Sequence, residues 1–121
     1  MSVSKITLAI ATLGLVAGAA HAQTKWVEID DQVQVAALGA TADQIDDLDV
    51  FDAAGTKLGD VEEVVGTDAN TATALVVDFD GNGGYADKDV VVPLDQFSHE
   101  NNRLVLKADA AAVTAMEVWK D

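Results

Sequence analysis

The sequence predicts a mainly β fold, an antiparallel sheet or barrel that ends in a short C-terminal α-helix. Runs rich in β-branched residues recur along the chain, and the connections between them are too short to hold crossover helices. Apolar side chains alternate in residues 75–79, where Leu75, Val77 and Phe79 share one side, as in a half-buried strand. Helical spacing of apolar residues occurs near the C-terminus, in residues 108–119.

The first 22 residues are predicted to be a cleaved signal peptide. Lys5 precedes an apolar run from Ile6 to Ala20, and Ala20-His21-Ala22 has the small-x-small form of a cleavage site. The alternative is an uncleaved anchor, but the run is rich in Ala and Gly and shorter than the roughly 20 strongly apolar residues of a membrane span. We therefore expect a periplasmic or secreted protein that keeps no stable membrane anchor. The chain has no cysteine, which excludes disulfides and a cysteine-linked lipid anchor.

The expected mature chain of 99 residues has the length of one domain and is strongly acidic. All 21 acidic residues follow Ala22, whereas one of the seven cationic residues, Lys5, precedes it, so cleavage changes the net charge from −14 to −15. A surface of this charge repels phosphate groups, which makes nucleic acid and anionic lipid poor partners. Favoured partners are divalent metal ions and a protein with a basic or apolar surface. The simplest alternative is that the charge serves solubility.

Residues 23–45 are expected to form an N-terminal extension to a domain that spans residues 46–121. The extension is either an N-terminal strand or a loosely docked segment, because its apolar residues share one parity. Its Trp26 is expected to pack against the fold rather than to bind a ligand. Near its end, Thr41 and Gln44 have the capping-box form, which predicts one helical turn.

Five strands are predicted in the domain, and turn residues join four of them into two hairpins. The strands cover residues 48–51, 58–65, 73–80, 89–92 and 103–107. Gly55 supplies the turn of the first hairpin, and a glycine loop joins the strands of the second. Pro93 ends the second hairpin because proline lacks an amide proton and cannot extend the ladder.

The last part of the chain is expected to hold a turn-rich segment and a helix. Residues 94–102 precede the final strand and contain two asparagines that favour a turn. The helix is predicted over residues 108–119 with Asp109 as its N-cap. Met116 and Trp119 are expected to fill the core, with a partner groove as the alternative.

Three segments of the domain share a pattern with a known family. They are Asp49-Val50-Phe51-Asp52-x-x-Gly55-x-x-Leu58-Gly59-x-Val61-x-x-Val64, Ala74-Leu75-Val76-Val77, and Lys88-Asp89-Val90-Val91-Val92-Pro93-Leu94. With these residues the chain resembles the PRC-barrel family over about residues 46–118. Family members are small, mainly antiparallel β-barrels, found in the photosynthetic reaction-centre H subunit, in a ribosome-maturation factor and in stand-alone exported bacterial proteins. The chain looks like the last group, and the resemblance implies a structural or protein-interaction module rather than an enzyme.

Two features depart from the family pattern. Many exported relatives have a more hydrophobic glycine loop, whereas this loop contains several carboxylates and an asparagine. Relatives often end the helix in a Met-Pro segment, where this chain has Met116-Glu117-Val118. The first departure leaves room for a metal site, and the second leaves the end of the helix open.

The acidic glycine loop also matches the spacing of an EF-hand calcium loop. The ligands predicted on this basis are Asp78, Asp80, Asn82, the Gly84 carbonyl and Asp89. The flanks are β-rich rather than helical, Asp89 is one methylene shorter than the usual glutamate, and Tyr85 stands where an aliphatic residue is expected. The alternatives are therefore a weak Ca²⁺ site, with a Kd of about 10⁻⁴ to 10⁻³ M, and a hairpin whose carboxylates face water.

No catalytic residues are predicted, and no cofactor is expected other than weakly bound Ca²⁺. His99, the single histidine after Ala22, is expected in a surface loop, and its neighbours Ser98 and Glu100 do not converge into a triad by adjacency. The pairs Asp30-Asp31 and Glu62-Glu63 show no sign of a buried carboxyl of raised pKa. The favoured function is an exported, non-enzymatic interaction module, the alternative is a divalent-cation binding module, and a small hydrolase is the least favoured class.

Overall fold

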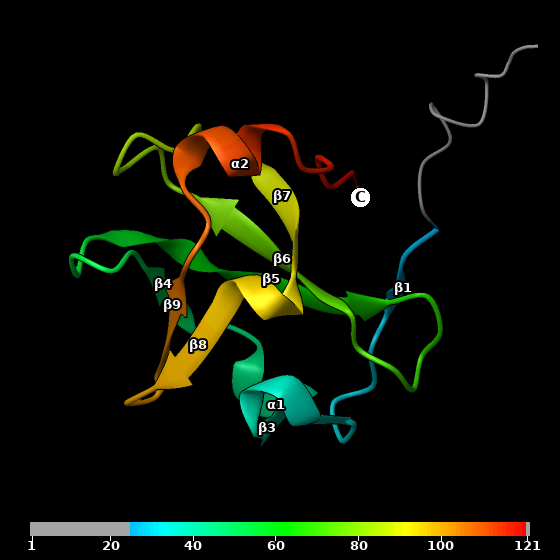
Figure 1. Cartoon of the computed structure of the whole chain (residues 1–121). Coiled ribbons are helices and arrows are strands. Elements are labelled where there is room, and N and C mark those ends of the chain that lie inside the picture. The colour runs from blue at the N-terminus through cyan, green and yellow to red at the C-terminus, as the bar shows by residue number, and fades with distance from the viewer. Residues whose placement is uncertain (1–24, 121) are drawn as a thin grey trace, which may run out of the picture.

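A seven-stranded sheet that curls into a half-barrel forms most of the molecule (Figure 1). The computed structural model describes residues 25–120, so the predicted signal peptide lies outside the described residues and stays a prediction. Neighbouring strands follow the order β7-β6-β5-β4-β9-β8, and β1 pairs with β5 on the edge opposite β6. The strands are β1 (Val27–Glu28), β4 (Asp49–Phe51), β5 (Lys57–Gly66), β6 (Ala74–Phe79), β7 (Asp89–Pro93), β8 (Phe97–Glu100) and β9 (Arg103–Leu106).

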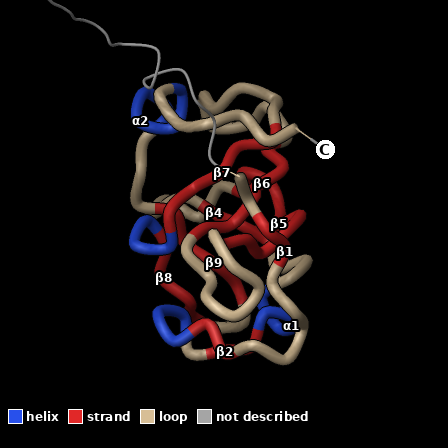
Figure 2. Tube along the Cα trace, turned by 90° about the vertical axis from the view of Figure 1, so that its right-hand side faces the viewer, coloured by secondary structure: helices blue, strands red, loops and turns tan. Residues whose placement is uncertain are grey.

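Short elements close the two ends of the curled sheet. They are β2 (Gln34–Val35), the 3₁₀ turn η3 (Ala36–Leu38), β3 (Ala40–Thr41), α1 (Ala42–Ile45), the 3₁₀ turn η4 (Leu94–Gln96) and α2 (Ala110–Thr114). In Figures 1 and 2, α1 lies at one end of the sheet and α2 at the other, and β2 pairs with β3 beside α1. Within residues 25–120, neither helix is long or apolar enough to cross a bilayer.

The inner face of the sheet and the two helices enclose the main core. In β6, the side chains of Leu75, Val77 and Phe79 are completely buried on this face, as their alternation predicted. Ile45 from α1 and Val113 from α2 belong to the same cluster and close its two ends. Each such side chain contributes about 1.5–3 kcal/mol when it leaves water. The predicted fold class, a small β-barrel with a short C-terminal helix, is confirmed.

Both predicted hairpins are present. β4 pairs with β5 and β6 pairs with β7, each in antiparallel register, and Pro93 ends β7 as predicted. Gly55 has a φ of 91°, the left-handed conformation that its turn requires. A side chain at Gly59 would collide with the Asp78 carbonyl oxygen, so glycine is needed where β5 and β6 approach.

The starts of both helices are confirmed. The Thr41 hydroxyl accepts the Gln44 amide proton, and the Gln44 side chain accepts the Thr41 amide proton in return. Asp109 accepts a hydrogen bond from the Ala112 amide at 2.9 Å. These caps satisfy amides that have no partner inside a helix.

The predicted helix over residues 108–119 is wrong in length, because α2 ends at Thr114. The following chain pairs instead with the edge of β7. The Val91 amide donates to the Glu117 carbonyl at 2.8 Å, and the Trp119 amide donates to the Asp89 carbonyl at 2.8 Å. The edge of β7 offers backbone groups that need partners, and pairing with them draws residues 117–119 out of the helix.

Within the predicted domain of residues 46–121, one strand, β8, was not predicted. It begins at Phe97, inside the segment expected to be turn-rich, and forms a hairpin with β9. The turn is Asn101-Asn102, whose φ values of 53° and 62° suit the two-residue turns that favour asparagine. β9 also pairs with β4 in parallel, through Val50 and Leu104. This long-range pairing is not encoded in the pattern of either strand alone.

Candidate functional site

The outer face of β5, β6 and β7 has an acidic end. Cross-strand pairing aligns four carboxylates across β4 to β7, and these residues form the acidic row: Asp49, Asp60, Asp78 and Asp89. Directly paired residues project from the same face, where like charges destabilise a sheet. Lys57 relieves the repulsion at one end, since its Nζ lies 3.3 Å from Oδ1 of Asp49. The rest of the row therefore presents concentrated negative charge.

A β-bulge in β5 adds two more carboxylates to this face. The register with β6 shifts between Val61 and Glu63, so Glu62 is the extra residue of the strand. Because of the bulge, both consecutive glutamates project outward instead of alternating. Carboxylate oxygens of Glu62, Asp78 and Asp89 lie within 4.8 Å of one another.

Burial and neighbouring negative charge raise the pKa of two members of the acidic row. Burial is the largest cause for the carboxyl of Asp78, followed by the negative charge of Asp89. Burial is also the largest cause for Asp60, followed by the charge of Asp80. A raised carboxyl pKa means that the ionised form is disfavoured. Cationic groups brought to this face would therefore relieve an existing electrostatic cost.

Two of the five predicted calcium ligands meet in the structure. Asp78 and Asp89 are direct cross-strand partners at the base of the glycine loop. Asp80, Asn82 and Gly84 lie beyond the end of β6, in the exposed part of the loop. The carboxylate beside the Asp78–Asp89 pair comes from β5 and was not among the predicted ligands. The calcium site stays a prediction.

Tyr85 anchors the glycine loop to the rest of the fold. Its ring stacks on Phe79 with 5.3 Å between ring centroids, and its hydroxyl donates to the Ala108 carbonyl at 2.6 Å. The side chain is buried, and the contact with Ala108 holds the loop against the start of α2. Tyr85, the residue that departs from the calcium-loop pattern, thus has a structural role.

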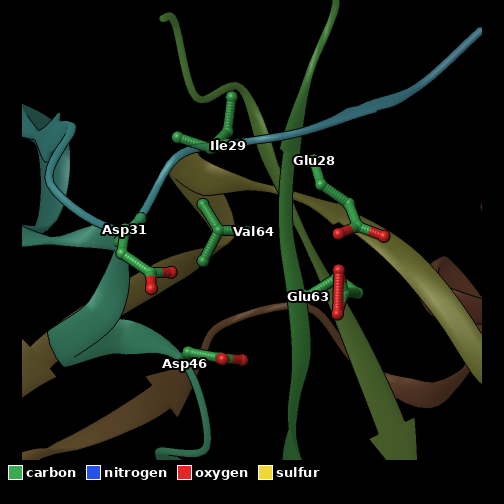
Figure 3. Close-up of a pocket in the computed structure, with 7 residues that line it drawn as sticks. Glu28, Ile29, Asp31, Asp46, Glu63 and Val64 are labelled. Carbon is green, nitrogen blue, oxygen red and sulfur yellow. The ribbon is translucent and has the colours of Figure 1, made fainter. Parts of the chain in front are cut away.

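A second group of carboxylates lines a pocket of about 140 Å³ (Figure 3). It lies between β1, β5 and the chain after α1, and its acidic residues are Glu28, Asp31, Asp46 and Glu63. No lysine, arginine or histidine is among the described residues that line it. Figure 3 shows the carboxyl groups of Glu28 and Glu63 pointing toward each other from the two strands.

The pocket raises the pKa of two of its carboxyls. Burial, a hydrogen bond with Glu28 and the charge of Glu28 raise the pKa of Glu63 to about 7. Burial, followed by the charge of Asp47, raises the pKa of Asp46. The Oδ1 atom of Asp46 is buried and has no hydrogen-bond partner among the described residues. The expectation that the Glu62-Glu63 pair holds no carboxyl of raised pKa is therefore wrong. The available signal was the Glu62-Glu63 pair, which breaks strand alternation and so indicates a bulge.

The other end of the outer face is apolar. Val65, Ala74, Val76 and Val91 form a small buried cluster there, and Trp26 and Trp119 pack against it. The indole nitrogen of Trp26 donates to Glu117 at 3.1 Å, which ties the two terminal segments together. Trp26 and Trp119 therefore have the packing role expected of them.

His99 does not support a hydrolytic site, and the expectation of a surface-loop histidine is wrong. It lies half-buried in β8, and its Nδ1 is 2.8 Å from the Leu38 carbonyl oxygen, so Nδ1 carries the proton. Ser98 and His99 are consecutive in a strand and so project to opposite faces. The hydrogen bond gives His99 a structural role between β8 and η3.

The acidic row and the bulge fall within a recognised domain. A model of the PRC-barrel domain matches residues 40–113, which is 74 of the 121 residues. The chain belongs to the PRC-barrel domain family. A search among curated proteins finds no match. The PRC-barrel match runs from the start of β3 into α2 and leaves β1 and residues 117–119 outside. Membership of the family suggests a structural or interaction module.

Proposed function

We propose that this protein is an exported, non-catalytic PRC-barrel module that docks a protein partner with a basic surface. The acidic row is the observation that carries the proposal. Its carboxylates lie side by side on a rigid sheet, and the pKa values of Asp60 and Asp78 are raised by burial and by neighbouring charge. A basic surface would neutralise this charge on contact, so docking would gain electrostatic free energy that the isolated domain lacks.

The residues around the acidic row support docking of a protein partner rather than catalysis. Catalysis needs a nucleophile or base held against a reacting atom, with groups that stabilise developing charge. On the described outer face, the row is surrounded by further carboxylates and by the apolar cluster beneath Trp26 and Trp119. A face that is acidic at one end and apolar at the other suits a partner that carries both basic and apolar residues. Export is supported by the leader pattern of residues 1–22.

Salt-dependent capture tests the docking proposal. Immobilised protein is incubated with a periplasmic extract at low ionic strength and then washed with increasing salt. The proposal predicts a retained partner that elutes as salt rises, because exposed charge contacts are screened within about 10 Å at 0.1 M salt. Retention that is indifferent to salt would contradict docking through the acidic row.

The second candidate is a divalent-cation binding module that uses the glycine loop. The meeting of Asp78 and Asp89 at the base of the loop is the observation that favours it. Ca²⁺ prefers six to eight oxygen ligands, and Asp80, Asn82 and the Gly84 carbonyl are the remaining predicted donors. The β flanks make a regular EF-hand impossible, so we expect a Kd of about 10⁻⁴ to 10⁻³ M.

Calorimetric titration with CaCl₂ in low-salt buffer tests this candidate. Wild-type protein should release or absorb heat in a saturable way, and its melting temperature should rise with Ca²⁺ because a ligand of the folded state stabilises it. The variant Asp80→Ala should lose this response, whereas Asp95→Asn, in the distant turn η4, should keep it. Equal heats for wild type and Asp80→Ala would exclude the loop as a calcium site.

A further inference from the structure

β1 is a short strand held to one edge of β5. Val27 pairs with Gly66 and Glu28 pairs with Val65, and the next residue, Ile29, donates its amide proton to the Val64 carbonyl at 2.9 Å. The Ile29 side chain is buried in the main core. β1 is therefore held by a few backbone hydrogen bonds and by the buried side chain of Ile29. Its attachment also depends on the interactions between the side chains of β1 and those of β5.

At this contact two acidic side chains meet. Glu28 on β1 and Glu63 on β5 point toward each other at the pocket of Figure 3. Among the described residues that line this pocket or act on the Glu63 carboxyl, the other titratable groups are also acidic: Asp31 from the chain after β1, Asp46 after α1 and Glu62 on β5. From β6, the residue paired with Glu63 is Val76, which is uncharged. Two ionised carboxylates would repel each other here, whereas one proton between them allows an O–H···O hydrogen bond.

We propose that Glu28 and Glu63 share a proton that holds β1 against β5, so that β1 docks at acidic pH and loosens progressively as the pH rises. The proton lies between the two facing carboxyls, and its loss replaces a hydrogen bond by repulsion. The device is built into this chain beside the PRC-barrel match, since Glu28 lies outside residues 40–113.

The raised pKa of the Glu63 carboxyl sets the direction in which pH changes the attachment of β1. Its pKa is about 7 with β1 in place, raised from the ordinary 4.5. A group whose pKa is raised by docking favours the docked state most at pH values below its ordinary pKa. That contribution is lost as the pH rises through the docked value, here about 7. β1 is therefore best attached below about pH 4.5 and is progressively released between there and pH 8.

Release of β1 changes the outer face of the sheet. Trp26 directly precedes β1 and covers the cluster of Val65, Ala74, Val76 and Val91. Loosening of β1 would lift Trp26 from this cluster and expose apolar surface next to the acidic row. The protein would thus present a more apolar face at pH 8 than at pH 5.

Hydrogen exchange of the Ile29 amide, measured by NMR on the whole protein in metal-free buffer, tests the proposal. The protection factor, which corrects for the intrinsic pH dependence of exchange, should fall on the order of tenfold between pH 5.5 and pH 8.5. A shift of one pKa unit changes the docking equilibrium of β1 by a factor of ten. The expected fall in the protection factor is smaller than the full pKa shift would give, because solvent screens these partly exposed groups. The Val61 amide of β5, which donates to the Leu48 carbonyl, exchanges only when the sheet opens and should be better protected than Ile29 at both pH values. Equal protection factors for Ile29 and Val61 would show that β1 opens only with the whole sheet and would overturn the proposal.

A glutamine substitution separates the shared proton from other effects of pH. In Glu28→Gln, the side-chain amide can donate to Glu63 whether or not Glu63 is ionised, so Ile29 protection should fall much less between the two pH values. The matched control Glu100→Gln makes the same chemical change at an exposed position on β8 and should retain the tenfold fall. An unchanged Ile29 protection factor in wild type, or an undiminished fall in Glu28→Gln, would overturn the proposal.

Discussion

Single residues explain where the glycine loop is held and where the sheet accumulates charge. Tyr85 fastens an otherwise polar loop through a ring contact with Phe79 and a hydrogen bond to Ala108. Glu62 is the extra residue of a bulge, and its presence puts two consecutive glutamates on one face. One tyrosine thus stabilises the fold, whereas one inserted glutamate increases its surface repulsion.

Removal of the Tyr85 hydroxyl should destabilise the protein modestly. The variant Tyr85→Phe keeps the stack on Phe79 but leaves the buried Ala108 carbonyl without its donor, which costs about 1–2 kcal/mol. Tyr85→Ala also removes the ring and should cost about 3–5 kcal/mol. Urea unfolding curves measure both free energies. A Tyr85→Phe variant as stable as wild type would show that the hydrogen bond contributes nothing net.

The elements with local signals could be predicted, and those that depend on distant partners could not. Hairpins, the Thr41 and Asp109 caps and the strand end at Pro93 follow from turn and capping residues nearby in sequence. The β8 strand and the end of α2 did not, because each is set by pairing with another strand. Residues of the candidate site, too, could be predicted only where the signal is local in the sequence. The Asp78–Asp89 spacing was visible in the sequence, but the meeting of Glu28 and Glu63 requires the β1–β5 pairing.

At the scale of the whole molecule, the chain carries a net charge of −14, and one sheet face and one pocket each gather several of its carboxylates. The carboxyls of Asp46, Asp60, Glu63 and Asp78 all have raised pKa values, with burial as the first cause in each case. Carboxylates that form ion pairs stabilise a fold when ionised, but these groups are crowded by other acids. Their ionisation therefore opposes folding.

The protein should accordingly be more stable at mildly acidic pH than at alkaline pH. Raised pKa values contribute stability that is complete below the ordinary range near 4 and is lost as the pH rises through the folded values, up to about 7 for Glu63. Urea unfolding in low salt should give a free energy about 1 kcal/mol higher at pH 5 than at pH 8, after allowance for solvent screening. Added salt should screen the repulsion at pH 8 and so reduce the difference in the free energy of unfolding between pH 5 and pH 8. Higher stability at pH 8 would contradict the electrostatic description.

Partner capture by an acidic-row variant tests the central claim most directly. The triple variant Asp60→Asn, Asp78→Asn and Asp89→Asn removes three charges of the row and should fold at least as stably as wild type, because it removes repulsion. Its control, Asp43→Asn, Asp95→Asn and Glu100→Gln, removes three charges from exposed positions elsewhere.

The measured quantity is the amount of partner retained from a periplasmic extract at low ionic strength. The docking account predicts that the acidic-row variant retains little of the partner that wild type binds, whereas the control retains nearly all of it. Equal retention by both variants, or an equal loss from both, would contradict the claim that this protein docks through its acidic row.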